Sequence, residues 1–231
     1  MVEDRSVFDL PGRAGEQIAA YGSDPDQVVE SYESSHPALG DLVLIHGGYW
    51  LPEYDRLHQR PFASALAEQG FRVHLVEYRR IPGNPDATVG DVRSALDKFK
   101  NAIVMGHSAG GHLALITADH PGVKAVIALA PVSDLMTGDL QNLDDGAIRK
   151  FLGTAASERT DLNPMDKKVT KPTTILHGNE DLRVPVSQSR DFSAKNSQVH
   201  YIEFKDMGHF ELIDPRSLAW PVILQELKKF L

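Results

Sequence analysis

The feature that most constrains this chain is a run of β-branched residues that leads into a serine flanked by glycines. Residues 103–112 read Ile-Val-Met-Gly-His-Ser-Ala-Gly-Gly-His, with Ser108 at the centre of a G-x-S-x-G pattern. This spacing is typical of a strand that turns sharply into a helix and raises the serine hydroxyl clear of the backbone, a nucleophile elbow. Such a turn strains the serine backbone and leaves no room for side chains at Gly106 and Gly110. The alternative is a glycine-rich turn without chemistry.

Apolar runs and amphipathic segments alternate along the chain. The apolar run that ends at His46 is continuous, as expected for a strand buried on both faces. We expect strands over residues 41–46, 71–78, 103–107, 124–130, 173–178 and 199–204, a weak edge strand over 27–32, and helices over 57–69, 88–99, 109–119, 186–195 and 217–231. This alternation predicts an α/β fold with a mostly parallel, doubly wound sheet and helices on both faces.

The chain length indicates one domain over residues 1–231. Residues 1–24 are polar and glycine-rich, which predicts a loose or partly helical lead-in. Residues 131–171 form a mixed polar insertion with one expected helix, about Asp145 to Leu152. The fold therefore has a small cap or none. The insertion is long enough to form a lid, to line a pocket or to make a dimer contact, and the sequence does not choose among these.

Composition excludes several classes of function. The net charge is −8, which argues against nucleic-acid binding, because phosphate contacts need a basic face. The absence of cysteine excludes disulfides, thiolate zinc sites and a cysteine nucleophile. His107 and His112 lack the spacing of a helical zinc site, so we expect no metal and no cofactor. The N-terminus lacks an apolar signal region and the longest apolar run is too short for a bilayer, so we expect no membrane association and a cytoplasmic location.

Two further strand ends carry reactive side chains. In open α/β sheets, the active site lies beyond the carboxyl ends of the strands. Asp181 follows the strand predicted over 173–178, and His209 follows the last one. Ser108, Asp181 and His209 then have the residue types and the chain order of a nucleophile, an orienting carboxylate and a base. Glu180 competes with Asp181 for the role of carboxylate.

The strand ending at His46 is followed by Gly-Gly-Tyr-Trp. Adjacent glycines allow backbone N–H groups to turn towards a ligand, so we expect an oxyanion hole from the N–H groups of Gly48, Tyr49 and Ala109. His46 is expected to brace this loop. The alternative for the glycine pair is an ordinary turn.

Aromatic residues near these strand ends are candidates for the walls of a substrate pocket. Tyr49, Trp50, Tyr54 and Phe210 offer rigid apolar contact. The alternative is that some of them only pack in the core.

The motif over residues 106–111, together with Asp181 and His209, resembles the α/β-hydrolase superfamily. The motif His-Gly-Gly-Tyr-Trp over 46–50 resembles kynurenine formamidase (arylformamidase) and related esterases. Tyr49 stands where the hormone-sensitive-lipase branch usually has a third glycine. The resemblance implies hydrolysis of an N-formyl aryl amide, such as N-formylkynurenine, to formate and the free amine.

Two alternative functions stay open. The same machinery suits a general carboxylesterase that acts on short acyl or aryl esters. A non-catalytic small-molecule binder on the same fold is the third hypothesis, although a binder needs none of Ser108, Asp181 and His209. The expected partner is a small-molecule ester or amide substrate, and a homodimer is left open.

Overall fold

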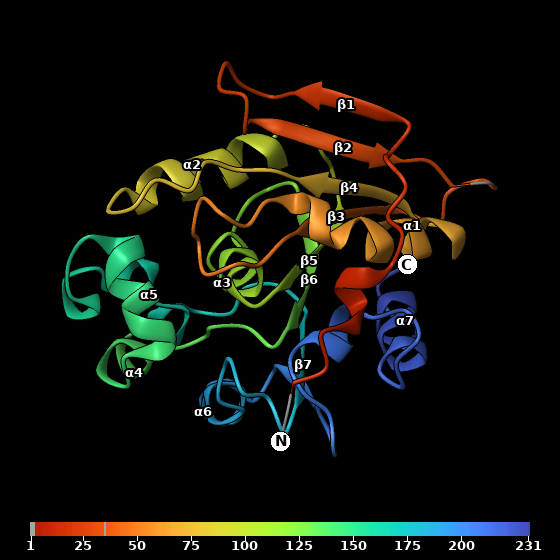
Figure 1. Ribbon diagram of the computed structural model, residues 1–231. Coiled ribbons are helices and arrows are strands. Elements are labelled where there is room, and N and C mark those ends of the chain that lie inside the picture. Colours follow the sequence, from red (N-terminus) through yellow and green to blue (C-terminus); the bar gives the residue numbers. More distant parts are fainter. Residues whose placement is uncertain (1–2, 35) are drawn as a thin grey trace.

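One eight-stranded sheet, in the order β1-β2-β4-β3-β5-β6-β7-β8, forms the centre of the computed structural model, which describes residues 3–34 and 36–231 (Figure 1). The β1–β2 and β2–β4 pairs are antiparallel, and every other pair is parallel. The strands are β1 (Gln17–Ala20), β2 (Val28–Tyr32), β3 (Asp41–Ile45), β4 (Arg72–Val76), β5 (Ala102–His107), β6 (Val123–Leu129), β7 (Thr173–Gly178) and β8 (His200–Phe204). The predicted doubly wound, mostly parallel sheet is confirmed.

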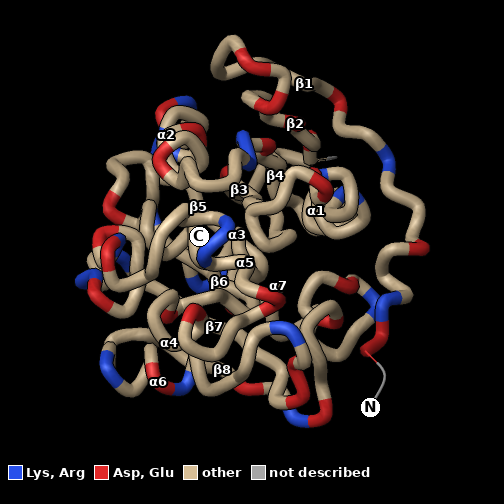
Figure 2. Tube along the Cα trace, turned by 60° about the vertical axis from the view of Figure 1, so that its left-hand side comes forward, with Lys and Arg blue, Asp and Glu red and all other residues tan. Residues whose placement is uncertain are grey.

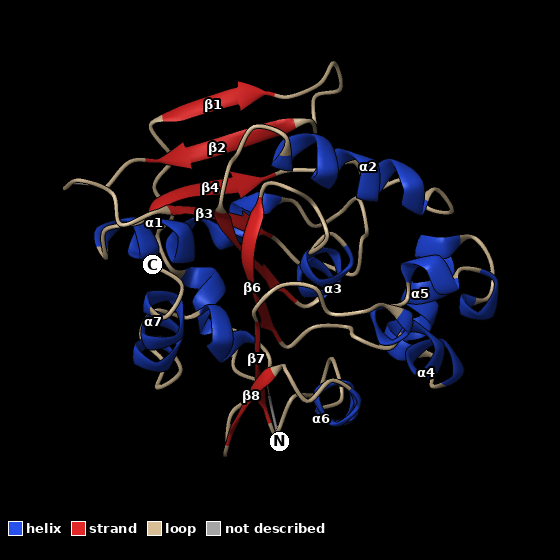
Figure 3. Ribbon diagram, turned by 180° about the vertical axis from the view of Figure 1, so that it is seen from behind, coloured by secondary structure: helices blue, strands red, loops and turns tan. Residues whose placement is uncertain are grey.

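Helices cover both faces of this sheet (Figure 3). They are α1 (Arg60–Glu68), α2 (Pro85–Leu96), α3 (Ala109–Ile116), α4 (Leu135–Leu140), α5 (Leu143–Leu152), α6 (Ser187–Lys195) and α7 (Trp220–Lys228). Helices α1 and α7 pack on one face, and α2, α3 and α6 pack on the other. Short 3₁₀ turns include η1 (Ser6–Asp9), η2 (Arg56–Gln59) and η6 (Phe210–Ile213).

The apolar run of β3 shows why the sheet is buried on both faces. Leu42 and Leu44 pack in the cluster that includes α1 and α7, whereas Val43 and Ile45 pack in the cluster that includes α2 and α3. All four side chains are fully buried. Successive side chains of a strand point to opposite faces, so a continuous apolar run serves two layers at once. Each such side chain contributes about 1.5–3 kcal/mol of burial free energy.

The N-terminal strands differ from the prediction. The segment expected as an edge strand is β2, which pairs through Val29 with Ala19 of β1 on one side and Val76 of β4 on the other. The edge is β1, which lies within the predicted loose lead-in. All its residues are exposed, including Ile18. A strand without a buried face has no apolar alternation, so the sequence carried no signal for it.

Two helix starts also differ from the prediction. Helix α2 begins at Pro85 rather than residue 88, because the Asn84 side chain caps it by accepting a hydrogen bond from Ala87 N–H. The helix expected over 57–69 is divided into the turn η2 and helix α1, which starts at Arg60. The strand predicted over 173–178 matches β7 at both ends.

The insertion over 131–171 contains more helix than expected. Besides α5, it holds α4 and the 3₁₀ turns η3 (Ala156–Glu158), η4 (Thr160–Leu162) and η5 (Pro164–Asp166). Helix α4 is six residues long and contains Gly138, where an added Cβ would lie 2.5 Å from Ile148 Cδ1 of α5. This close contact between α4 and α5 is a tertiary feature, which explains why a glycine occurs in a helix that local propensity disfavours.

The order of the strands determines where a site forms. After β3 the chain adds β4 on one side, and it then crosses to add β5 on the other side. The loops that leave β3 and β5 therefore diverge at the same edge of the sheet, which is the topological switch point where open α/β sheets bind ligands. The loop that begins at His46 and the turn at Ser108 meet there.

Gly110 provides a stability test of this packing. An added Cβ at Gly110 would lie 2.1 Å from Ile45 O, whereas at Gly90 of α2 it would meet nothing within 4 Å. We expect Gly110→Ala to lower the free energy of unfolding by about 3 kcal/mol or more, because backbone atoms must move apart. Gly90→Ala, the matched control, should raise it by about 0.5–1 kcal/mol. Denaturant unfolding measures both, and a tolerated Gly110→Ala would contradict the close approach.

Candidate active site

Ser108 lies in a strained turn between β5 and α3. Its φ of 56° and ψ of −119° lie outside the regions that non-glycine residues favour, as predicted. An added Cβ at Gly106 would lie 2.1 Å from Gly110 O, so the predicted need for small residues in this turn is confirmed. The Ser108 N–H donates to Leu129 O at 2.8 Å, which ties the turn to β6.

Asp181 and His209 form a buried pair although 28 residues separate them. His209 Nδ1 donates to Asp181 Oδ2 at 2.6 Å, and the N–H groups of Arg183 and Val184 donate to Asp181 Oδ1 at 2.7 and 2.8 Å. Burial by itself raises the pKa of Asp181, but the charge of His209 and the hydrogen bonds from His177 and His209 lower this pKa further, to well below its usual range. The side chain that contacts His209 is therefore an ionised Asp181, not Glu180.

His177 is a partner of Asp181 that the sequence analysis did not single out. Its Nε2 lies 3.0 Å from both Asp181 Oδ2 and Val184 O, and its Nδ1 lies 2.7 Å from Ser189 Oγ. Both neighbours of Nε2 accept hydrogen bonds, so Nε2 carries the proton and the Ser189 hydroxyl donates to Nδ1. The position at the end of β7 was visible in the sequence, but the contact with α6 was not.

His107, next to the serine, also supports this pair. Its Nε2 donates to His209 O at 3.0 Å. Burial and the nearby charge of His209 lower the pKa of His107 well below its usual range, so the ring stays neutral. His107 thus supports the backbone of His209.

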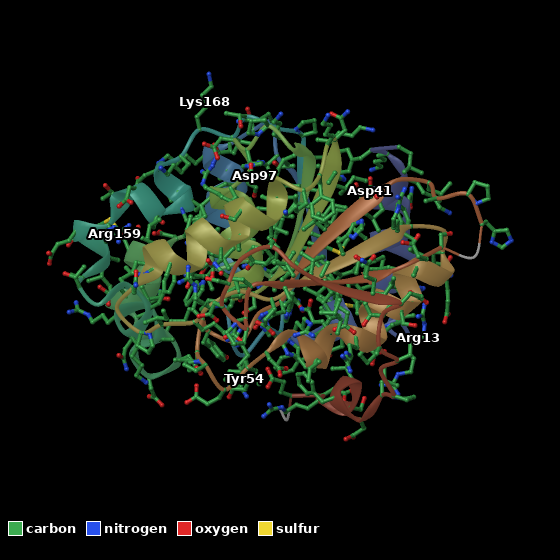
Figure 4. The ribbon with its side chains drawn as sticks, turned by 90° about the horizontal axis from the view of Figure 1, so that it is seen from above. Arg13, Asp41, Tyr54, Asp97, Arg159 and Lys168 are labelled. Atoms are coloured by element: carbon green, nitrogen blue, oxygen red, sulfur yellow. The ribbon has the colours of Figure 1, made fainter. Side chains whose placement is uncertain are left out.

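Ser108 and His209 line one pocket of about 700 Å³. Four other residues from the sequence analysis line it too, namely Gly48, Tyr49, Tyr54 and Phe210. Figure 4 shows Tyr54 on the same side of the molecule as the N-terminal turn. The structure thus brings most of the predicted site residues together around one cavity.

Trp50 does not line this pocket, which corrects its expected place in the wall. Its side chain is 2% exposed and stacks on Phe151 of α5, with ring centroids 4.5 Å apart. Tyr49 and Trp50 both have positive φ, at 55° and 56°. These angles turn the chain so that Tyr49 faces the pocket and Trp50 enters the core.

The N-terminal segment supplies an unexpected wall. Arg5, Phe8 and Asp9 line the pocket, and Phe8 packs edge-on against Phe210 with ring centroids 4.8 Å apart. The Arg5 guanidinium lies 5.5 Å from each of these two rings. Within the described residues, the insertion over 131–171 contributes nothing to this lining. The segment expected as a lead-in therefore covers the site from one side.

The proposed oxyanion donors lie next to the serine. An added Cβ at Gly47 would lie 3.1 Å from Ser108 Cβ, so the loop after β3 contacts the turn directly. In the described part of the chain, the N–H groups of Gly48 and Tyr49 donate to no protein acceptor. Ala109 is the first residue of α3, so its N–H lacks an intrahelical partner. His46 Nδ1 donates to Gly47 O at 2.7 Å, which confirms that His46 braces the loop.

The described residues hold no sign of a metal centre or a membrane span. Among residues 3–34 and 36–231, no group of three or more His, Cys, Asp or Glu side chains is placed to hold a metal ion. In the same residues, no helix has the length and apolarity needed to cross a bilayer. Figure 2 shows Lys and Arg interspersed with Asp and Glu along the trace.

The sheet, the strained serine turn and the buried histidine–aspartate pair together define the α/β-hydrolase fold. The sequence profile of the BD-FAE family matches residues 30–195, and the chain belongs to this family. Esterase LipC of Mycobacterium tuberculosis is 29% identical over 84% of this chain. The chain spans 59% of LipC and 52% of a second relative, LipM, which is about half the length of the curated relatives it matches.

Solved structures share this fold. Esterase B from Lactobacillus rhamnosis has a TM-score of 0.76 at 21% identity, over 98% of this chain and 89% of that chain. A thermophilic esterase from Thermogutta terrifontis, Est2, has a TM-score of 0.72 at 22% identity, over 94% and 91% of the two chains. The predicted α/β-hydrolase fold is therefore confirmed.

His112 makes the stability of the site sensitive to acid. Burial lowers the pKa of His112 from 6.5 to about 4, and its Nε2 donates to Leu162 O of the insertion. Because the folded state disfavours a protonated His112, the neutral ring contributes to stability. This contribution is complete above pH 6.5 and is lost as the pH falls towards 4. Between pH 7 and pH 4, wild type should lose about 3 kcal/mol more unfolding free energy than His112→Gln, whose amide keeps a donor but does not titrate. Equal slopes for wild type and His112→Gln would contradict the assignment.

Proposed function

We propose that this protein is a serine hydrolase that cleaves small acyl esters through Ser108, His209 and Asp181. The observation that carries the proposal is the strained Ser108 on one pocket with His209, whose ring donates to a buried, ionised Asp181. An imidazole that donates from Nδ1 keeps Nε2 as an acceptor, and Nε2 is the atom that a general base needs.

The geometry supports the following mechanism. His209 Nε2 accepts the Ser108 hydroxyl proton while Oγ attacks the acyl carbon. The tetrahedral oxyanion binds the N–H groups of Gly48, Tyr49 and Ala109. The C–O bond to the leaving group breaks, and the leaving oxygen takes the proton from His209. Water then attacks the acyl-enzyme with His209 as base, which releases the acid and restores the serine hydroxyl.

The related proteins support the ester reaction class. LipC is named an esterase and LipM a probable carboxylic ester hydrolase. Est2 is also described as phosphonylated by sarin, in a structure with a TM-score of 0.74 to this chain at 20% identity. An N-formyl aryl amide is the second substrate class, and the motif over residues 46–50 supports it. The same acyl-enzyme route cleaves both bonds.

The first test uses Ser108→Ala. We expect a fall in kcat of about 10³-fold or more on p-nitrophenyl acetate, because no nucleophile remains. A fluorophosphonate probe should label wild type and leave the variant unlabelled. Full activity of Ser108→Ala would contradict the mechanism, and a wild type that neither hydrolyses nor labels would favour the non-catalytic binder.

Comparison of kcat/KM for N-formylkynurenine and p-nitrophenyl acetate decides between the two substrate classes. A higher value for the formyl amide, lost in Ser108→Ala, would assign the protein as a formamidase. Activity on the ester alone would assign a carboxylesterase.

A third test concerns the pocket wall made by the N-terminal turn. Phe8 contacts Phe210 and lines the pocket, so Phe8→Ala removes part of the apolar surface that faces the substrate. We expect KM for an aryl ester to rise about 3–10-fold with a smaller change in kcat, because the lost contact is made equally in the ground state and the transition state. Leu140→Ala is the control, since Leu140 is 83% exposed and lies outside the pocket. Unchanged KM in Phe8→Ala would show that the turn does not contact substrate.

A further inference from the structure

A single buried carboxylate contacts both ends of the loop that carries the proposed oxyanion donors. Glu77, the residue after β4, is 1% exposed. Its Oε1 accepts a hydrogen bond from His46 Nε2 at 2.9 Å, and its Oε2 accepts one from Arg56 N–H at 2.9 Å. His46 and Arg56 flank residues 47–55, so one side chain links the two ends of the loop that contains Gly48 and Tyr49.

This loop needs such support because its backbone is strained. Gly48, Tyr49 and Trp50 are consecutive residues with φ of 110°, 55° and 56°. A left-handed conformation costs about 1–2 kcal/mol at each residue other than glycine. Two backbone hydrogen bonds lie within the loop, from Leu51 N–H to Gly48 O and from Tyr54 N–H to Leu51 O. They close turns but do not fix the loop against the sheet.

His46 contacts the loop backbone and Glu77 through its two ring nitrogens. Its Nδ1 lies 2.7 Å from Gly47 O and its Nε2 lies 2.9 Å from Glu77 Oε1. A carbonyl and a carboxylate only accept, so the ring links Gly47 O of the loop to the Glu77 carboxylate. The ring is fully buried and stacks on Tyr78, whose hydroxyl donates to His46 O at 2.8 Å.

Several charged groups surround His46 and Glu77. Arg80 lies 3.5 Å from His46 Nε2, but it donates to Tyr78 O at 2.7 Å and to Glu77. His58 and Asp26 also lie near this pair. The Arg56 guanidinium is shared between Glu77 and Glu30. Burial by itself raises the pKa of Glu77, but the charges of His46 and Arg80 and the hydrogen bonds lower it to about 2. Glu77 is therefore ionised.

We propose that Glu77 is a positioning residue that holds the loop over residues 47–55 at both ends, through the His46 ring and the Arg56 backbone N–H. The proposal rests on the proposed function, because the loop matters only if it binds an oxyanion. Glu77 itself is absent from the pocket lining, so it acts through the loop and not on the substrate.

The experiment compares Glu77→Gln with wild type on p-nitrophenyl acetate. We expect kcat to fall about 10–100-fold with KM within about 3-fold, because displaced N–H donors weaken the transition state more than the bound ester. The Ki of a trifluoromethyl ketone, which forms a tetrahedral oxyanion with the serine, should rise by the same factor as kcat/KM falls. An unchanged kcat and Ki would overturn the proposal.

Glu30→Gln is the matched control. Glu30 is also a fully buried carboxylate and binds Arg56 Nε at 2.8 Å, but its backbone contact is with Gly15 N–H rather than with the loop. We expect this variant to lose thermal stability while kcat stays within about 3-fold of wild type. Equal losses of kcat in both variants would show a general effect of buried charge and would overturn the positioning role.

A measurement on wild type keeps the proposal testable even if Glu77→Gln does not fold. The ¹⁵N shift of His46 Nε2 should show a proton on this nitrogen, which donates to Glu77, and an Nε2 without a proton would overturn the proposal. This shift does not depend on catalysis. A wild type that neither hydrolyses esters nor reacts with fluorophosphonate would refute the proposed function separately.

Discussion

The contact between the start of α3 and the end of β3 is the constraint on which the rest of the site depends. Gly110 allows α3 to approach the carbonyl of Ile45, and Gly106 allows the turn itself to close. This approach places Ser108 beside the loop that follows β3, at the point where the strand order reverses. Any side chain at these glycines would separate the serine from the N–H groups of Gly48 and Tyr49. The close packing of α3 against β3 is therefore required to bring the proposed catalytic groups together.

The site contains two buried, charged carboxylates, and each of them accepts several hydrogen bonds. Asp181 accepts from His209, His177 and two backbone N–H groups. Glu77 accepts from His46, Arg80 and the Arg56 backbone. Isolated carboxylates at such depth would take up a proton, but these donors keep both ionised. Asp181 thereby orients the proposed base, and Glu77 supports the loop that carries the proposed oxyanion donors.

The two segments without strong sequence patterns have roles that the sequence did not assign. The sequence left a lid, a pocket wall and a dimer contact open for the insertion over 131–171. The insertion packs against Trp50 and His112 through Phe151 and Leu162, and none of its described residues lines the pocket. The N-terminal turn instead forms the wall, with Phe8 against Phe210. Glu3, just before this turn in the chain, forms an ion pair with Arg183, with 2.9 Å between Glu3 Oε2 and Arg183 Nη2. Substrate selection in this protein is thus expected to depend on residues far from the serine in the chain.

The sequence by itself determined the α/β class, the strained serine turn and the positions of Asp181 and His209, because each depends on local spacing at a strand end. Periodicity also located most strands, since burial on both faces leaves a continuous apolar run. Only the tertiary structure decided that β1 forms the edge, that Trp50 is a core residue, and that His177, Phe8 and Glu77 belong to the site. These features arise from contacts between residues that are distant in the chain, and local sequence patterns do not encode such contacts.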